Sequence, residues 1–125
     1  MNPPKVRGKV NPKTAANTLR RASSLRPKLA LVLGSGFHKA TEQATVVATV
    51  PYTKLAGFLA PSVPGHAGQA LIGHLGETEI IILQGRAHYY EGHSMAEITF
   101  PIRVLAEYGI ESLLLTNAAG GINRK

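Results

Sequence analysis

Two runs of consecutive apolar residues restrict the fold of this chain more than any other feature. LALVLGSG (29–36) stays apolar until it reaches a glycine pair, and ESLLLTN (111–117) holds three consecutive leucines before the small residues AAGG. A continuous apolar run of this length, without alternation, is typical of a strand that is buried on both faces of a sheet. We therefore expect both runs to be buried strands.

Three further segments extend this predicted sheet. The β-branched residues of TVVATVPY (45–52) favour a strand. QALIGHL (69–75) and TEIIILQG (78–85) are separated by only two residues, Gly-Glu, and this spacing predicts a hairpin. The intervening segment KLAGFLAPSVPGHAG (54–68) is punctuated by glycine and proline, so we expect a loop there.

A helix is predicted over residues 94–108. It begins with a serine and a glutamate at capping-box spacing, and Gly109 is placed to end it. Pro101 falls inside this segment, so the helix either kinks there or begins near Thr99. Because strands alternate with helices along the chain, the predicted fold class is α/β, a mixed β-sheet flanked by helices.

The positive charge of the chain is concentrated at its N-terminus. The formal net charge is +7, yet residues 1–28 hold eight Lys/Arg and no acid, whereas the rest of the chain holds six Lys/Arg against seven glutamates. We interpret residues 1–13, which include three prolines, as a flexible basic arm. A helix is expected next, at about 14–25, and residues 14–125 are expected to belong to a single domain.

Two other interpretations of the basic arm are weaker. Basic arms can bind polyanions, but this one has no interleaved aromatic residues and no nucleic-acid-binding motif, so a nucleic-acid partner is not expected. An Arg- and Ser-rich segment without acids also has the composition of an organellar transit peptide. An ordinary first helix accounts for the same residues, and we favour it.

The composition excludes several classes of site. The chain has no cysteine, which excludes disulfides, thiolate metal sites and thiol nucleophiles. No apolar run approaches the roughly 20 residues that a membrane-spanning helix needs. We expect a cytoplasmic protein with no membrane partner.

The most polar stretch of the chain is QGRAHYYEGH (84–93), which follows a predicted strand. Arg86 and His88 are two residues apart, so in an extended segment their side chains point the same way. A guanidinium offers a planar fork of donors that suits phosphate, and it would oppose a metal cation. We therefore predict no metal site, while an anion site and a polar surface loop both fit this stretch.

Three glycine-containing segments also flank the predicted strands. Ser35 in GSG (34–36) adds a hydroxyl to backbone N–H groups that can approach an anion closely. VPGHAG (63–68) presents His66 between two glycines, and NAAGG (117–121) follows the last strand, where open α/β sheets tend to bind ligands. Each segment taken alone also fits a simple turn.

Taken in order, LVLGSG, VPGHAG, GRAHYYEG, TFPIRVLAEYGI and LLLTNAAGGIN resemble the N-terminal part of the trimeric-type purine nucleoside phosphorylases. The resemblance covers about residues 14–124. It implies an α/β fold with a mixed sheet and a distorted barrel, assembled as a homotrimer. It also implies an enzyme, a pentosyltransferase that cleaves purine (deoxy)ribonucleosides with inorganic phosphate, giving free base and (deoxy)ribose 1-phosphate. The implied partners are a purine nucleoside and phosphate, which is a co-substrate, and no cofactor is needed.

The resemblance also implies roles for residues of these motifs. His88 and Glu91 would be the catalytic pair, with Glu91 positioning the phosphate-binding histidine. The implied phosphate-binding residues are Ser35, His66, Arg86, Ala87, His88 and Ala118, the last through its backbone N–H. The implied nucleoside-binding residues are Tyr90, Ala119 and Gly120.

Members of the family continue well beyond the region that resembles this chain. Their distal half supplies the residues that recognise the purine and assist its departure. We therefore expect this chain to supply the phosphate-binding half of a site, with a catalytically inactive phosphate-binding fragment as the alternative. A strand at 111–117 near the end of the chain should also leave an unpaired apolar sheet edge, which predicts association or poor solubility.

Overall fold

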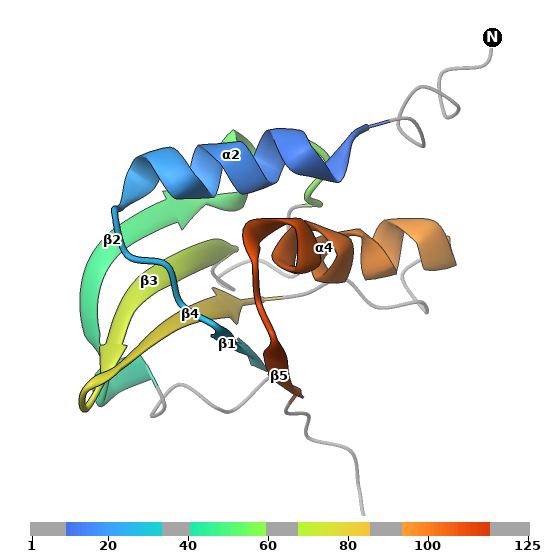
Figure 1. The fold of residues 1–125 in the computed structure, drawn as a ribbon. Helices are drawn as coiled ribbons and strands as arrows, with labels where there is room; N and C mark the ends of the chain where they lie inside the picture. The colour runs from blue at the N-terminus through green and yellow to red at the C-terminus, as the bar shows by residue number, and fades with distance from the viewer. Residues whose placement is uncertain (1–9, 34–40, 60–67, 86–93, 116–125) are drawn as a thin grey trace, which may run out of the picture.

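The computed structural model describes residues 10–33, 41–59, 68–85 and 94–115 (Figure 1). These residues form one five-stranded sheet in the order β2-β3-β4-β1-β5. The strands are β1 (Leu29–Leu33), β2 (Thr45–Pro51), β3 (Gln69–Leu75), β4 (Thr78–Gln84) and β5 (Ser112–Leu115). The helices are α2 (Pro12–Ala22), α4 (Met95–Tyr108) and the short 3-10 helix η1 (Tyr52–Lys54).

The sheet is mixed, as predicted. β1 pairs in parallel with β4 on one side and with β5 on the other. β3 pairs antiparallel with β2 and with β4, and the β3–β4 pair is the predicted hairpin. Gly76, the first of its two turn residues, has φ +65°, a conformation that glycine adopts without steric cost.

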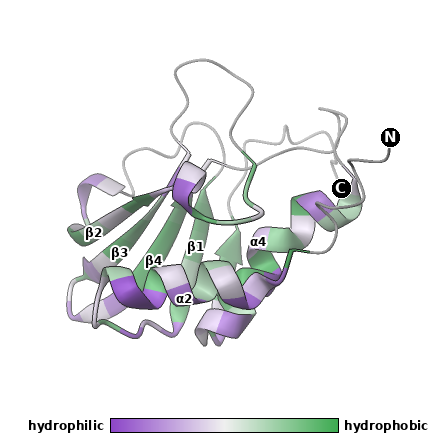
Figure 2. Cartoon of the chain, turned by 90° about the horizontal axis from the view of Figure 1, so that it is seen from above, coloured by the Kyte–Doolittle hydropathy of each residue, from purple (hydrophilic) through white to green (hydrophobic). Residues whose placement is uncertain are grey.

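The two α-helices, α2 and α4, pack on the same face of the sheet and beside each other (Figure 1). Their buried side chains meet alternate residues of four strands, and the strands are mostly hydrophobic in Figure 2. Leu19 from α2 and Val104 from α4 are fully buried in this cluster. Burying side chains of this size contributes about 1.5–3 kcal/mol each, so this face of the sheet is the principal core of the described part of the chain.

The first helix lies slightly earlier in the chain than predicted. Asn11 caps α2 by accepting a hydrogen bond from the backbone N–H of Lys13 at 2.9 Å, and Pro12 occupies the first turn. An asparagine cap followed by proline is a favourable helix start, because neither position needs an intrahelical N–H partner. The helix ends at Ala22 rather than near residue 25.

The second helix begins where its capping box predicts. The Glu97 N–H donates to Ser94 Oγ at 3.1 Å, and the Ser94 N–H donates to Glu97 Oε1 at 3.0 Å. The helix therefore begins at Met95 and runs through Pro101, so the alternative start near Thr99 is wrong. Gly109 ends it with φ +112°, a left-handed conformation that favours glycine.

The two apolar runs differ in burial. β1 is buried along four of its five residues, as predicted, because it lies between two strands. β5 was expected to be buried, but in the described part of the chain it is the edge strand, and Leu114 and Leu115 are more than half exposed. β5 is thus not buried in the described part of the chain, where it forms the unpaired apolar edge that was expected.

No helix in the described ranges is long and apolar enough to cross a membrane.

Candidate functional site

The chain segments that carry the predicted site residues all leave the sheet at one end of its strands, the end at which β1, β4 and β5 finish. We call this end of the sheet the site edge. β1 and β4 end together, with Leu33 opposite Gln84, and β5 ends beside them, with Leu115 opposite Val32. β3 runs the other way, so its first residue, Gln69, lies opposite Gln84 at the same edge. Segments 34–40, 60–67, 86–93 and 116–125 are therefore attached to neighbouring positions on the sheet.

The predicted site residues themselves lie outside the described residues, so their roles stay predictions. They are Ser35, His66, Arg86, Ala87, His88, Tyr90, Glu91, Ala118, Ala119 and Gly120. The structure brings together the strand ends to which these residues are attached. It thereby relates four motifs that are far apart in the sequence to a single edge of one sheet.

Tyr52 is the described residue that links two of these segments. β2 also ends at the site edge, and Tyr52 follows its last residue. The Tyr52 N–H donates to the Gly68 carbonyl at 2.9 Å, and its hydroxyl donates to the Gly85 carbonyl at 2.5 Å. Gly68 is the last residue of the VPGHAG motif and Gly85 is the first residue of the GRAHYYEG motif, so a single residue, through its backbone and its side chain, ties the two together.

The Tyr52 hydroxyl is a buried donor. The residue is only 4% exposed, and burial raises the pKa of Tyr52 well above its ordinary value. Removing a phenol from water disfavours the charged phenolate, so the hydroxyl keeps its proton. It is therefore available to donate to the Gly85 carbonyl across the physiological pH range.

Two aromatic side chains hold the Tyr52 ring in place. The ring centroids of Tyr52 and Phe58 are 4.9 Å apart, and the Phe58 ring packs edge-on against Phe100 of α4 at 6.2 Å. Gly57 allows this packing, because a Cβ at that position would lie 2.4 Å from the Phe100 ring. Tyr52 is thus fixed between the end of β2 and the first half of α4.

A neighbouring hydrogen bond reinforces the same edge. The Gln69 side-chain amide donates to Gln84 Oε1 at 2.7 Å, directly across the β3–β4 pair. This bond and the Tyr52–Gly85 bond both hold the last residues of β4. The point at which the chain leaves β4 is therefore fixed on two sides.

A cavity of about 200 Å³ opens beside Tyr52, between the sheet and the first half of α4. Its walls are mostly apolar side chains, including Val32, Phe58, Leu83, Ile98 and Leu115. Such walls suit an apolar or ring-shaped group better than a free anion. Within the described ranges, no three potential metal-ligating side chains come together.

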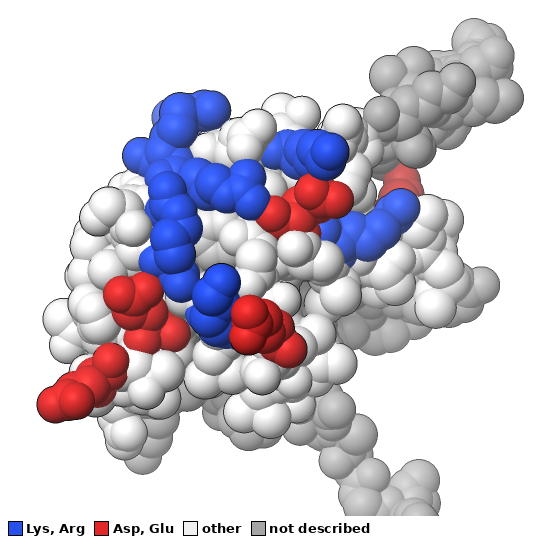
Figure 3. All heavy atoms as spheres, viewed as in Figure 1, with Lys and Arg blue, Asp and Glu red and all other residues white. Residues whose placement is uncertain are grey.

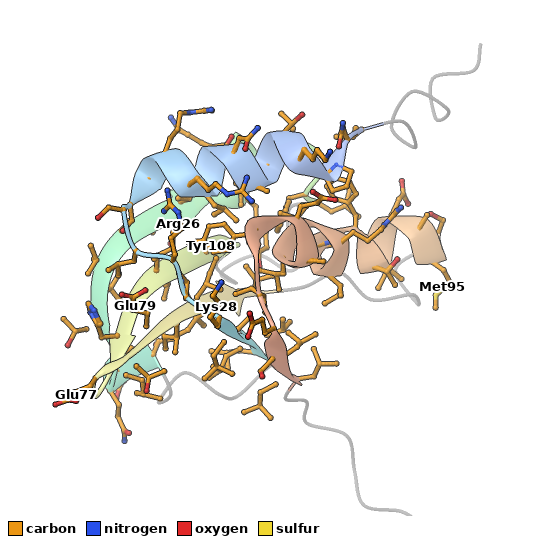
Figure 4. The ribbon with its side chains drawn as sticks, viewed as in Figure 1. Arg26, Lys28, Glu77, Glu79, Met95 and Tyr108 are labelled. Carbon is orange, nitrogen blue, oxygen red and sulfur yellow. The ribbon has the colours of Figure 1, made fainter. Side chains whose placement is uncertain are left out.

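The described cations gather mainly at the other end of the strands, which we call the opposite edge, over α2 and the residues after it (Figure 3). Arg20 donates to the Glu107 carbonyl at the end of α4, and Arg26 donates to the Ser23 and Leu25 carbonyls at 2.8 and 2.7 Å. Figure 4 shows Arg26, Lys28 and Tyr108 at this end of the molecule, far from Met95. Arg20 thus binds a carbonyl at the end of α4, and Arg26 binds the carbonyl of Ser23, which follows the last residue of α2, so both arginines support the structure.

Reasoning from the sequence placed Tyr52 at the end of a strand and gave it no role in a site. Its partner Gly85 is 33 residues away, and no local pattern indicates that bond. The only available signal was a tyrosine placed between a strand and a glycine-rich loop.

Comparison with known proteins identifies relatives that are all phosphorylases. Residues 28–125 match the model of the phosphorylase superfamily. The chain is 40% identical over 109 residues to purine nucleoside phosphorylase 1 of Geobacillus stearothermophilus, covering 87% of this chain and 40% of that protein. It is 39% identical over 110 residues to purine nucleoside phosphorylase of Rattus norvegicus, covering 88% of this chain and 38% of that protein.

Solved structures agree with this result. Isoform 2 of purine nucleoside phosphorylase from Schistosoma mansoni, in complex with cytosine and ribose-1-phosphate, matches with a TM-score of 0.81 at 40% identity, over 91% of this chain and 40% of that one. Another Schistosoma mansoni purine nucleoside phosphorylase, in complex with inosine, matches with a TM-score of 0.80 at 37% identity, over 90% and 39%. The chain spans about two fifths of the length of these relatives, and it belongs to the phosphorylase superfamily.

Proposed function

We propose that this chain is part of an enzyme that phosphorolyses purine (deoxy)ribonucleosides, and that it supplies the phosphate-binding half of the active site. The products are the free purine base and (deoxy)ribose 1-phosphate. The names of the relatives support the reaction, and their complexes with ribose-1-phosphate and inosine support the class of substrate. Inorganic phosphate is a co-substrate in this proposal, and no cofactor or metal takes part.

The observation that carries the proposal is the common site edge. The four motif segments adjoin strand ends that pair with one another at Leu33, Gln69, Gln84 and Leu115 or next to them. Open α/β sheets bind ligands beyond the carboxyl ends of their parallel strands, and β1, β4 and β5 are parallel and end there. Backbone N–H groups of the glycine-rich segments and the Arg86 guanidinium would then face one anion.

In this proposal each motif has a distinct task. Arg86 and His88 donate to phosphate oxygens, and Ser35 and the Ala118 N–H complete the shell. Glu91 orients His88, while His66 and Ala87 support the phosphate from their own loops. Tyr90, Ala119 and Gly120 line the nucleoside side.

The chemistry depends on positioning. A phosphate oxygen forms a bond to C1′ as the bond from C1′ to the purine nitrogen breaks, and the purine leaves with that electron pair and gains a proton. The ribose carries oxocarbenium character in the transition state. A fixed phosphate dianion stabilises this positive charge and is also the nucleophile, so donors that hold the dianion in place lower the barrier.

The alternative function is phosphate binding without turnover. The share of the relatives that the chain spans, about two fifths, favours this alternative for the chain by itself. Assembly as a homotrimer and a cytoplasmic location, both expected from the sequence, stay predictions.

The test is phosphate-dependent release of hypoxanthine from inosine by the purified 125-residue chain. Arg86→Ala is the test variant, and Glu42→Ala, at an exposed position away from the motifs, is the matched control. Turnover that Arg86→Ala removes and Glu42→Ala leaves unchanged would support the proposed reaction and the role of Arg86. Equal loss in both variants would contradict the role of Arg86, and saturable phosphate binding without product would establish the alternative.

A further inference from the structure

We infer that Tyr52 is a positioning residue for phosphate binding, because its two hydrogen bonds fix the points at which the chain enters and leaves the predicted phosphate-binding segments. This inference rests on the proposed function and deepens it. It assigns a task to a residue that lies outside all five motifs.

The two hydrogen bonds of Tyr52 come from its backbone and from its side chain. The Tyr52 N–H and hydroxyl are at opposite ends of one residue, and they hold the Gly68 and Gly85 carbonyls at 2.9 and 2.5 Å. Gly68 follows the segment that contains His66, and Gly85 precedes Arg86. Tyr52 therefore bridges the two loop ends, next to the paired residues Gln69 and Gln84.

The bond from the Tyr52 hydroxyl orients the Gly85 peptide group. The carbonyl of Gly85 and the N–H of Arg86 belong to one planar peptide unit, so fixing the carbonyl also fixes the plane from which residue 86 departs. Gly85 has φ +99°, a left-handed conformation that redirects the chain at the end of β4. A hydrogen bond at this bend has more effect on the direction of the next segment than one inside a regular strand.

Tyr52 itself cannot shift easily. It is 4% exposed, the ring of Phe58 packs against its ring, and the ring of Phe100 packs against Phe58. The donor is thus set into the core, and only the acceptors belong to the loop ends. An anion site depends on donors held within fractions of an ångström, so a rigid support of this kind raises affinity without touching the ligand.

The experiment compares two buried tyrosines by removing one hydroxyl from each. Tyr52→Phe keeps the ring and deletes the bond to Gly85. Tyr108→Phe is the matched control: Tyr108 is also 4% exposed, and its hydroxyl has no hydrogen-bond partner among the described residues. Phosphate affinity is measured by titration calorimetry well below the melting temperature of each variant, where a loss of stability alone does not change the dissociation constant.

We expect the dissociation constant for phosphate to rise about three- to tenfold in Tyr52→Phe, as the loss of one neutral hydrogen bond allows, and to stay unchanged in Tyr108→Phe. Hydrogen exchange of peptides that cover residues 85–93 should also become faster in Tyr52→Phe without ligand. An unchanged dissociation constant and unchanged exchange in Tyr52→Phe would overturn the inference while leaving the proposed function intact. Absence of phosphate binding by the unmodified chain would overturn the proposed function, and the inference with it.

A second variant covers the case in which Tyr52→Phe does not fold, as judged by near-ultraviolet circular dichroism. Phe58→Leu keeps the Tyr52 hydroxyl but loosens the packing that holds its ring. We expect a smaller rise in the dissociation constant, about two- to threefold, and wild-type affinity in this variant would overturn the inference.

Discussion

The two edges of the sheet are built in different ways. At the opposite edge, short local devices close the elements: the Gly76–Glu77 turn joins β3 to β4, and Gly109 ends α4 with hydrogen bonds to the Leu105 and Ala106 carbonyls. At the site edge, Tyr52 bonds to Gly85, which is 33 residues away. The turns at the opposite edge are thus closed by neighbours in the sequence, and Arg20 and Arg26 add bonds there to distant residues. At the site edge, by contrast, the long-range bond of Tyr52 joins two of the predicted motif segments.

Two tyrosines show the same contrast. Tyr52 and Tyr108 are equally buried, but only Tyr52 has a hydrogen-bond partner for its hydroxyl among the described residues. The comparison indicates that substitutions at the site edge should alter both stability and phosphate affinity. Substitutions at the opposite edge should alter stability alone.

The largest difference is expected between two glycines with positive φ. Gly57→Ala should lower the free energy of unfolding by about 3 kcal/mol, because the left-handed backbone (φ +91°) and the contact with Phe100 both oppose a Cβ. Gly109→Ala should cost only about 1 kcal/mol, since its φ is +112° but nothing lies within 4 Å of the new Cβ. Urea unfolding of both variants measures the two losses, and equal losses would remove the packing role assigned to Gly57.

Phosphate titration of the same two variants extends the comparison. Gly57→Ala displaces the aromatic side chains that hold Tyr52, so its phosphate affinity should fall, whereas Gly109→Ala should bind phosphate normally. A loss of affinity in Gly109→Ala would contradict the division between the edges.

A smaller effect is expected from the cap of α4. Ser94→Ala removes the hydroxyl that accepts from the Glu97 N–H and should lower the free energy of unfolding by about 1 kcal/mol. Thermal or urea unfolding provides the measurement, with Ser94→Thr as the control that keeps a capping oxygen. If Ser94→Thr lost as much stability as Ser94→Ala, the capping bond would not be the cause.

The smallest effect is expected at the exposed ion pair of the opposite edge. Lys28 Nζ and Glu111 Oε2 are 3.9 Å apart, and both side chains are well over half exposed. Lys28→Ala should change the free energy of unfolding by less than about 0.5 kcal/mol, since water and salt screen such pairs. Phosphate affinity should not change, and a clear loss of affinity would assign the basic face a role in anion binding.

Local patterns allowed much of the fold to be predicted. The capping box of Ser94 and Glu97 and the hairpin at Gly76 depend on residues within a few positions of each other, and both were correct. Strand burial was harder, because β1 and β5 have similar apolar sequences but only β1 has a neighbour on each side. Burial depends on what packs against a strand, and a strand's own residues do not contain that information.

The segments of the candidate site could be predicted from the sequence, but their arrangement in space could not. The motifs indicated which segments matter, and the pairing of the strand ends, which only the structure provides, relates those segments to one edge. Tyr52 could not have been identified, because its bond to Gly85 crosses 33 residues of sequence. The association expected from the apolar β5 edge stays a prediction, and a monomeric chain with a sharp cooperative melt would contradict it.

Direct titration of the purified chain with inorganic phosphate tests the central claim most directly, with Arg86→Ala as the test variant and Arg21→Ala, on the exposed side of α2, as the matched arginine control. We predict saturable binding of phosphate that weakens by about tenfold or more in Arg86→Ala, because a charged hydrogen-bond donor is lost, and that persists in Arg21→Ala. No saturable binding by the unmodified chain, or equal binding by the two arginine variants, would contradict the assignment of a phosphate site to this edge of the sheet.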